Sequence, residues 1–258
     1  MAAIPCRPSL SGALDKGTST VSPHWRDSNT DAISPPMRAL YHLPLSPYAR
    51  KVRLALAEKR LPVDLRLEKP WERRGEYLEL NPAGTVPTLV EDNGLVIPDS
   101  AVICEYLDEA YPDVPLLGDT LVERVEVRRL TAWFDGKFAA EVTQNLLGEK
   151  FTRQQARRGT ADPSAIRTGY TALRYHLDYL GWLADNREWL AGPNLSLADF
   201  AAAAHLSCLD YIGDVDWRLS RPAKDWYARI KSRPGFRTLL TDRVPGITPP
   251  EHYVDLDF

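Results

Sequence analysis

From residue 37 onward, apolar and polar positions form short alternating runs that give way to long helical runs. Short apolar or alternating runs predict strands near residues 38–43, 63–67, 88–90 and 95–97. Between them, helices are predicted from Pro47, near Tyr77 and after Asp99-Ser100, and Asn93-Gly94 is a strong hairpin signal. The order strand–helix–strand–helix–strand–strand–helix predicts an α/β first domain.

The second half of the chain has only helical periodicity. Apolar residues keep helical spacing from Leu121 through Asn145 and again from Ile166 to Leu183, after a Pro-rich linker near residues 111–115. We therefore predict domains at 37–113 and 118–242, followed by a C-terminal tail at 243–258. Residues 1–36 are rich in Ser, Thr, Pro and Asp without periodicity, which predicts a disordered extension. Two interpretations of it stay open: an over-long start before Met37, or a functional tail.

Composition excludes several classes of function. A net charge of −3 gives no support for nucleic-acid binding. The three cysteines lack metal-ligand or CxxC spacing, so we expect no metal site and a reducing compartment. No stretch approaches the ~20 apolar residues of a membrane span.

Three short motifs in the first domain are candidates for chemistry. Ser46 precedes Pro47, so it is either a plain helix cap or a hydroxyl that holds a thiolate at a helix N-terminus. The pair Val86-Pro87 opens a strand, and its peptide bond is either an ordinary trans bond or a cis bond at a tight turn. The pair Asp99-Ser100 precedes an amphipathic helix and has the pattern of an N-cap.

Together these motifs resemble the glutathione S-transferase family, over about residues 37–246. The resemblance implies an α/β thioredoxin-like N-terminal domain with a mixed four-stranded sheet, plus an all-α C-terminal domain. It also implies glutathione as a substrate or vestigial ligand, with Ser46 bonding the sulfur. Val86, before a cis Pro87, would pair with the cysteinyl part, and Asp99-Ser100 would receive the γ-glutamyl end.

The C-terminal tail and an aromatic loop resemble one branch of that family more than the rest. The tail keeps Tyr253, Leu256 and Phe258, and the loop contains Trp71 and Arg73. Proteins of this branch bind FtsZ filaments as homodimers, are regarded as non-catalytic, and would lie in the cytoplasm at the division site. We predict these five residues as partner-binding, while for the tail a second interpretation stays open, in which it packs back over a groove of its own chain. The sequence favours such a scaffold, with a transferase acting on an apolar electrophile as the alternative.

Overall fold

A four-stranded mixed sheet forms the N-terminal part of the protein. The computed structural model describes residues 37–157 and 159–256, so the predicted extension at 1–36 and Phe258 lie outside the described residues. The strands have the order β2-β1-β3-β4, with β1 parallel to β2 and antiparallel to β3, and β3 antiparallel to β4. Their bounds are Ala39–His42 (β1), Asp64–Leu67 (β2), Thr88–Val90 (β3) and Val96–Pro98 (β4).

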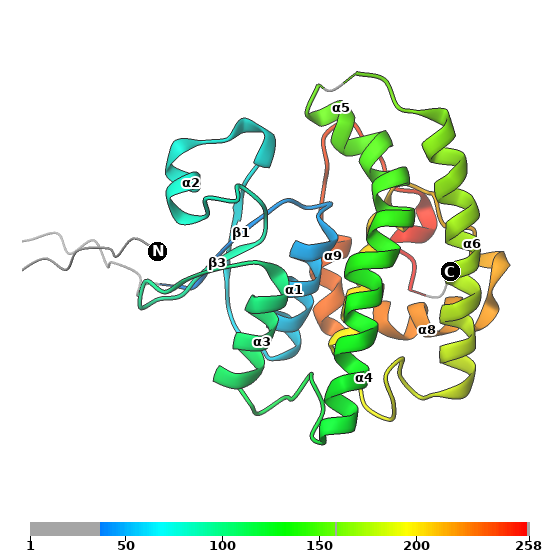
Figure 1. Cartoon of the computed structure of the whole chain (residues 1–258), viewed down its shortest axis with the longest axis horizontal. Coiled ribbons are helices and arrows are strands. Elements are labelled where there is room, and N and C mark those ends of the chain that lie inside the picture. Colours follow the sequence, from blue (N-terminus) through cyan, green and yellow to red (C-terminus); the bar gives the residue numbers. More distant parts are fainter. Residues whose placement is uncertain (1–36, 158, 257–258) are drawn as a thin grey trace, which may run out of the picture. The chain divides into compact units, whose positions relative to one another are not determined.

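The two faces of this sheet are covered by different helices. Side chains alternate between faces along a strand, so Leu40 and Tyr41 of β1 point in opposite directions. Tyr41 packs on Tyr77 of α2, at 5.4 Å between ring centroids, while buried Leu40 belongs to the main core. Figure 1 shows α1 and α3 between the sheet and the C-terminal helices, with α2 on the other side. These helices span Pro47–Glu58 (α1), Gly75–Leu80 (α2) and Ser100–Ala110 (α3), and a 3₁₀ turn η1 spans Pro70–Glu72.

The C-terminal part is built from helices only, within the described residues. One long helical rod consists of α4 and η2, and the last backbone bond of η2, from Arg153 N–H to the Gly148 carbonyl, reaches back five residues instead of four. The elements are α4 (Leu121–Ala132), η2 (Trp133–Thr152), α5 (Arg153–Gln155), α6 (Pro163–Asn186), α7 (Leu197–Tyr211), η3 (Trp217–Leu219), α8 (Arg221–Lys231), η4 (Pro234–Phe236), α9 (Arg237–Leu240) and η5 (Glu251–Tyr253).

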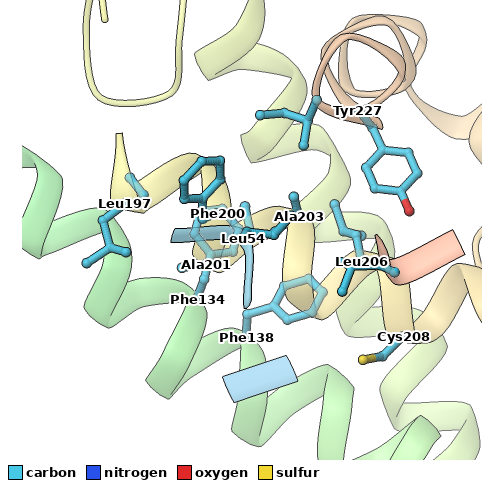
Figure 2. Packing of buried hydrophobic residues seen from close by; sticks show 14 of the residues in the cluster. Leu54, Phe134, Phe138, Leu197, Phe200, Ala201, Ala203, Leu206, Cys208 and Tyr227 are labelled. Carbon is cyan, nitrogen blue, oxygen red and sulfur yellow. The ribbon is translucent and has the colours of Figure 1, made fainter. Parts of the chain in front are cut away.

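The core is centred on α7, whose fifteen residues are all buried. Four consecutive alanines, Ala201–Ala204, allow neighbouring helices to approach closely, and α7 packs against α1, α4, η2 and α8. Figure 2 shows Phe134 and Phe138 of η2 turned toward Leu54 of α1 and toward α7. Thus α7 joins the sheet part to the helical part through one continuous core.

The predicted fold class is confirmed. The seven elements of the N-terminal part follow the predicted order, and the part after residue 118 is helical. Cys104 and Cys208 are both buried, and neither forms a disulfide with another described residue. Among residues 37–157 and 159–256, no helix is both long and apolar enough to cross a lipid bilayer.

Candidate functional site

A cavity of about 600 Å³ lies between the sheet part and η2. All five residues predicted to bind glutathione line it, namely Ser46, Val86, Pro87, Asp99 and Ser100. From the opposite side, η2 contributes residues spaced by four or five, which follow one face of its wide turns: Asp135, Ala139, Thr143, Gly148 and Thr152. The fold therefore assembles motifs that are well separated in the sequence, from Ser46 to Thr152, into one site.

Ser46 is the N-cap of α1, so the capping interpretation is confirmed. Its Oγ accepts a hydrogen bond from the Ala49 N–H at 3.3 Å, and its own N–H donates to the Leu43 carbonyl at 2.9 Å. Pro47 occupies the first turn, where a missing N–H costs nothing. Capping uses an oxygen lone pair and leaves the hydroxyl proton available as a donor. The structural role is thus compatible with bonding to a ligand.

The Val86-Pro87 peptide bond is cis, as the family resemblance implied. The loop before it is held from α2 and its C-cap: Asn81 Nδ2 donates to the Thr85 carbonyl at 2.8 Å, and the Tyr77 hydroxyl donates to the same oxygen. Asn81 also contacts Thr88 Oγ1 at 3.1 Å. Sequence reasoning missed Tyr77 and Asn81, although Asn-Pro directly after a short helix is a local signal for a turn.

Asp99 caps α3 from a left-handed backbone conformation, with φ of +74°. Its Oδ1 accepts from the N–H of Ala101 at 2.7 Å and of Val102 at 3.4 Å. Ser100, the first residue of α3, is buried at the wall of the cavity. The N-termini of α1 and α3 therefore both border the cavity, and their partial positive charge favours an anionic group there.

Fixed cations are missing from this wall. None of the cavity-lining residues, all of them in the described part of the chain, is Lys or Arg, whereas Asp99 and Asp135 are both lining residues. In the loop beside the cavity, Lys69 pairs with Glu72 at 2.9 Å and Arg74 pairs with buried Glu68. Arg73 is exposed, and Trp71 is half-buried and lines the cavity. A ligand carboxylate would therefore rely on helix ends rather than on a cationic side chain.

A buried polar cluster that the sequence did not reveal supports the η2 wall. Asp135 forms an ion pair with Lys51 of α1, its main-chain carbonyl accepts from the Tyr48 hydroxyl at 3.0 Å, and its Oδ1 lies 3.5 Å from His205 Nε2. Burial opposes ionisation, but His205 and Lys51 outweigh it and hold the pKa of Asp135 below its usual range. Burial lowers the pKa of His205, so that imidazole is neutral at pH 7. The η2 wall thus contains the Asp135 carboxylate, whose negative charge is balanced by Lys51 of α1.

The C-terminal segment folds back onto the helical part. Tyr253, predicted to contact a partner, is fully buried against Tyr211, with ring centroids 5.1 Å apart. Its side chain is a packing anchor here, so a contact with a partner would require the segment to detach. Leu256 is half-buried and Val254 is exposed. The accessible surface of the described tail is therefore formed around Val254 and Leu256.

Comparison with known proteins identifies the family. Residues 40–115 match the model of the glutathione S-transferase N-terminal domain. FtsZ-localized protein A of Caulobacter vibrioides is 50% identical over 224 residues, covering 86% of this chain and 98% of the relative. The chain belongs to the glutathione S-transferase family.

Two solved structures of glutathione S-transferases extend this likeness. One from Rhodospirillum rubrum is 53% identical with a TM-score of 0.84, covering 86% of this chain and all of that one. One from Methylobacterium radiotolerans, in complex with glutathione sulfonate, is 30% identical with a TM-score of 0.66, covering 81% and 99%. The chain is therefore similar both to proteins named glutathione S-transferases and to one protein named for its localisation with FtsZ.

Proposed function

We propose that this protein associates with FtsZ filaments and acts as a non-catalytic or weakly catalytic scaffold in bacterial cell division. The observation that carries the proposal is the 50% identity to FtsZ-localized protein A, which extends over 98% of that relative. In this proposal the protein works in the cytoplasm at the division site. The fold provides a rigid body, and accessible side chains around the cavity mouth and the tail provide contacts.

The surface candidates are Trp71, Arg73 and Leu256, with Phe258 proposed from the sequence. Arg73 is exposed at the end of η1 in a left-handed conformation, with φ of +46°, which turns the chain sharply after Trp71. Trp and Arg are enriched among the residues that dominate protein–protein binding energies. The placement of half-buried Trp71 and exposed Arg73 on one turn supports this loop as part of the FtsZ contact.

The proposed scaffold is a homodimer. Four large apolar side chains on α3 and α4 are more than half exposed: Val102 (54%), Leu121 (77%), Val122 (77%) and Val125 (57%). Both helices lie against the same core and expose these residues to water, which is costly for aliphatic groups. A second copy that covers this surface would bury them, and two copies would also double the contacts with a filament.

The second candidate function is glutathione transfer to an apolar electrophile. It is favoured by the assembly of Ser46, Val86, Pro87, Asp99 and Ser100 in one cavity at two helix N-termini. The Ser46 hydroxyl would donate to the glutathione sulfur, and Val86 and Asp99-Ser100 would hold the backbone and the γ-glutamyl end. The lack of Lys and Arg among the described residues that line the cavity weighs against tight binding, because a carboxylate gains most from a cationic partner.

Two experiments separate these functions. Co-sedimentation with assembled FtsZ filaments should show weaker binding by about tenfold for Trp71→Ala and Arg73→Glu, the size expected for interface hot spots. Arg221→Glu makes the same charge change at a side chain on α8 that is 90% exposed and serves as the control. Equal binding by all three variants and the wild type would remove this loop from the contact.

Calorimetric titration of glutathione into the wild type and Ser46→Ala tests the second function. Binding together with turnover of an electrophile, lost in Ser46→Ala, would make the protein an enzyme. A Kd of about 1 mM corresponds to a binding free energy of about −4 kcal/mol. If several millimolar glutathione produces no heat, binding is weaker than this and the cavity is vestigial.

A further inference from the structure

Arg50 lies one turn after Ser46 on α1, and its side chain is completely buried. The guanidinium donates in three directions. Nε donates to the Pro44 carbonyl at 2.6 Å, Nη1 to Ser207 Oγ at 2.9 Å and to the Tyr253 hydroxyl at 3.2 Å, and Nη2 to Asp242 Oδ2 at 3.3 Å. One rigid, permanently charged fork therefore contacts the loop before Ser46, helix α7 and the C-terminal segment.

The first of these contacts positions the loop that carries Ser46. Pro44 lies within the turn closed by the bond from the Ser46 N–H to the Leu43 carbonyl. Leu43 and Leu45, on either side of Pro44, line the cavity. The bond from Arg50 thus fixes the centre of a turn whose flanking residues form the cavity wall.

The other contacts anchor the C-terminal segment, defined here as residues 242–253. The Tyr253 hydroxyl accepts from Arg50 and donates to the Leu239 carbonyl at 3.2 Å, and Asp242 also accepts from Arg53 at 2.8 and 3.0 Å. Nearby, His252 Nε2 lies 3.0 Å from Asp210 Oδ1, and Lys231 donates to the His252 carbonyl at 2.7 Å. Arg50 is the residue that the segment shares with the Ser46 loop.

We infer that Arg50 couples the C-terminal segment energetically to the Ser46 loop. Detachment of the segment removes Tyr253 and Asp242 from a buried guanidinium that cannot release its proton. A buried charge that loses partners must find others or admit water, so Arg50 shifts and its bond to Pro44 weakens. By linkage, whatever holds the segment in place tightens the Ser46 loop, and whatever fixes that loop favours the docked segment. The coupling does not depend on the identity of partner or ligand.

Hydrogen–deuterium exchange on the full chain tests this coupling with two matched variants. Tyr253→Phe keeps the ring against Tyr211 and removes only the hydroxyl that contacts Arg50. Tyr211→Phe removes a hydroxyl from the same region, the one that accepts from the Val244 N–H at 3.0 Å, without touching a bond of Arg50. Both substitutions are small enough to preserve the core.

The coupling predicts about tenfold faster exchange of the Ser46 and Arg50 amides in Tyr253→Phe, the size of one lost bond to a charged group. Tyr211→Phe should change exchange near Val244 and leave those two amides as in the wild type. If the Ser46 and Arg50 amides of Tyr253→Phe exchange at the wild-type rate, the inference is overturned. So would equal acceleration in both variants, because that would indicate general loosening rather than transmission through Arg50.

Discussion

Lys51 and Asp135 form an ion pair that joins α1 to η2, and so connects the two walls of the cavity. The Lys51 side chain is fully buried and that of Asp135 is 18% exposed. Removing one member of a buried pair leaves the other charge uncompensated, which typically costs about 3–5 kcal/mol. We expect Lys51→Met to lower the free energy of unfolding, measured by urea denaturation, by about that amount.

The double variant Lys51→Met/Asp135→Asn should recover part of this loss, because no buried charge is left unpaired. Lys137→Met is the control, since its pair with Glu141 is about 40% exposed on both sides and such pairs contribute about 0–1 kcal/mol. Strictly additive costs in the double variant, or equal costs for Lys51→Met and Lys137→Met, would contradict the proposed role of this pair.

His42 predicts a dependence of stability on pH. Burial, followed by the charge of Arg53, lowers the pKa of His42 from 6.5 to about 4, and its buried Nδ1 has no hydrogen-bond partner among the described residues. Between these values the unfolded chain binds a proton that the folded protein does not, so stability falls as pH decreases from 6.5 to 4. The loss between pH 7 and pH 5 from this residue is about 2 kcal/mol.

His42→Gln removes this titration and serves as the comparison. Urea denaturation at pH 7 and pH 5 should show a drop that is about 2 kcal/mol smaller in His42→Gln than in the wild type. Parallel pH profiles for the two proteins would show that His42 does not supply the effect. Other carboxyl and histidine groups contribute equally to both proteins and cancel in the difference.

The buried contacts of Asp199 allow a prediction of how much stability is lost when a buried helix cap is removed. Its carboxylate accepts from the N–H groups of Ser196 and Leu190 and from the indole of Trp226, each at 3.0 Å. Asp199→Ala would leave these buried donors unsatisfied, so we expect a loss of about 3 kcal/mol or more in urea denaturation. Glu123→Ala, in the solvent-exposed capping box of α4, should cost only about 1 kcal/mol. Similar losses at both caps would refute the importance of burial.

The exposed apolar surface on α3 and α4 leads to a prediction of how a charged substitution there affects the proposed dimer. Val125→Glu would introduce a charge at the interface, so light scattering should give the monomer mass of 29.0 kDa where the wild type gives twice that mass. Val254→Glu is the matched control, because Val254, directly after the C-terminal segment, is also 50% exposed. A wild-type protein that is already monomeric, or a dimeric Val125→Glu, would rule out this interface.

Local patterns were sufficient to predict much of the architecture and part of the site. Helix caps, the hairpin at Asn93-Gly94 and the motifs around Ser46, Val86-Pro87 and Asp99-Ser100 depend on neighbouring residues, and their spacing is visible in the sequence. The capping box of Ser196 and Asp199 follows the same local rule. Family resemblance supplied what local patterns left open, including the cis bond before Pro87.

Contacts between distant residues could not be predicted in this way. Lys51 and Asp135 are 84 residues apart, and Arg50 and Tyr253 are 203 apart. A lysine or arginine on an amphipathic helix is normally expected at the surface, and nothing near Lys51 or Arg50 signals burial. Tyr253 was predicted to contact a partner because its tail resembles one branch of the family, whereas its aromatic ring packs on Tyr211.

Co-sedimentation of the wild-type protein with assembled FtsZ filaments measures the proposed association itself. The proposed function predicts saturable pelleting that requires assembled filaments. Pelleting no greater than in the absence of FtsZ, at every protein concentration measured, would contradict the proposed scaffold role.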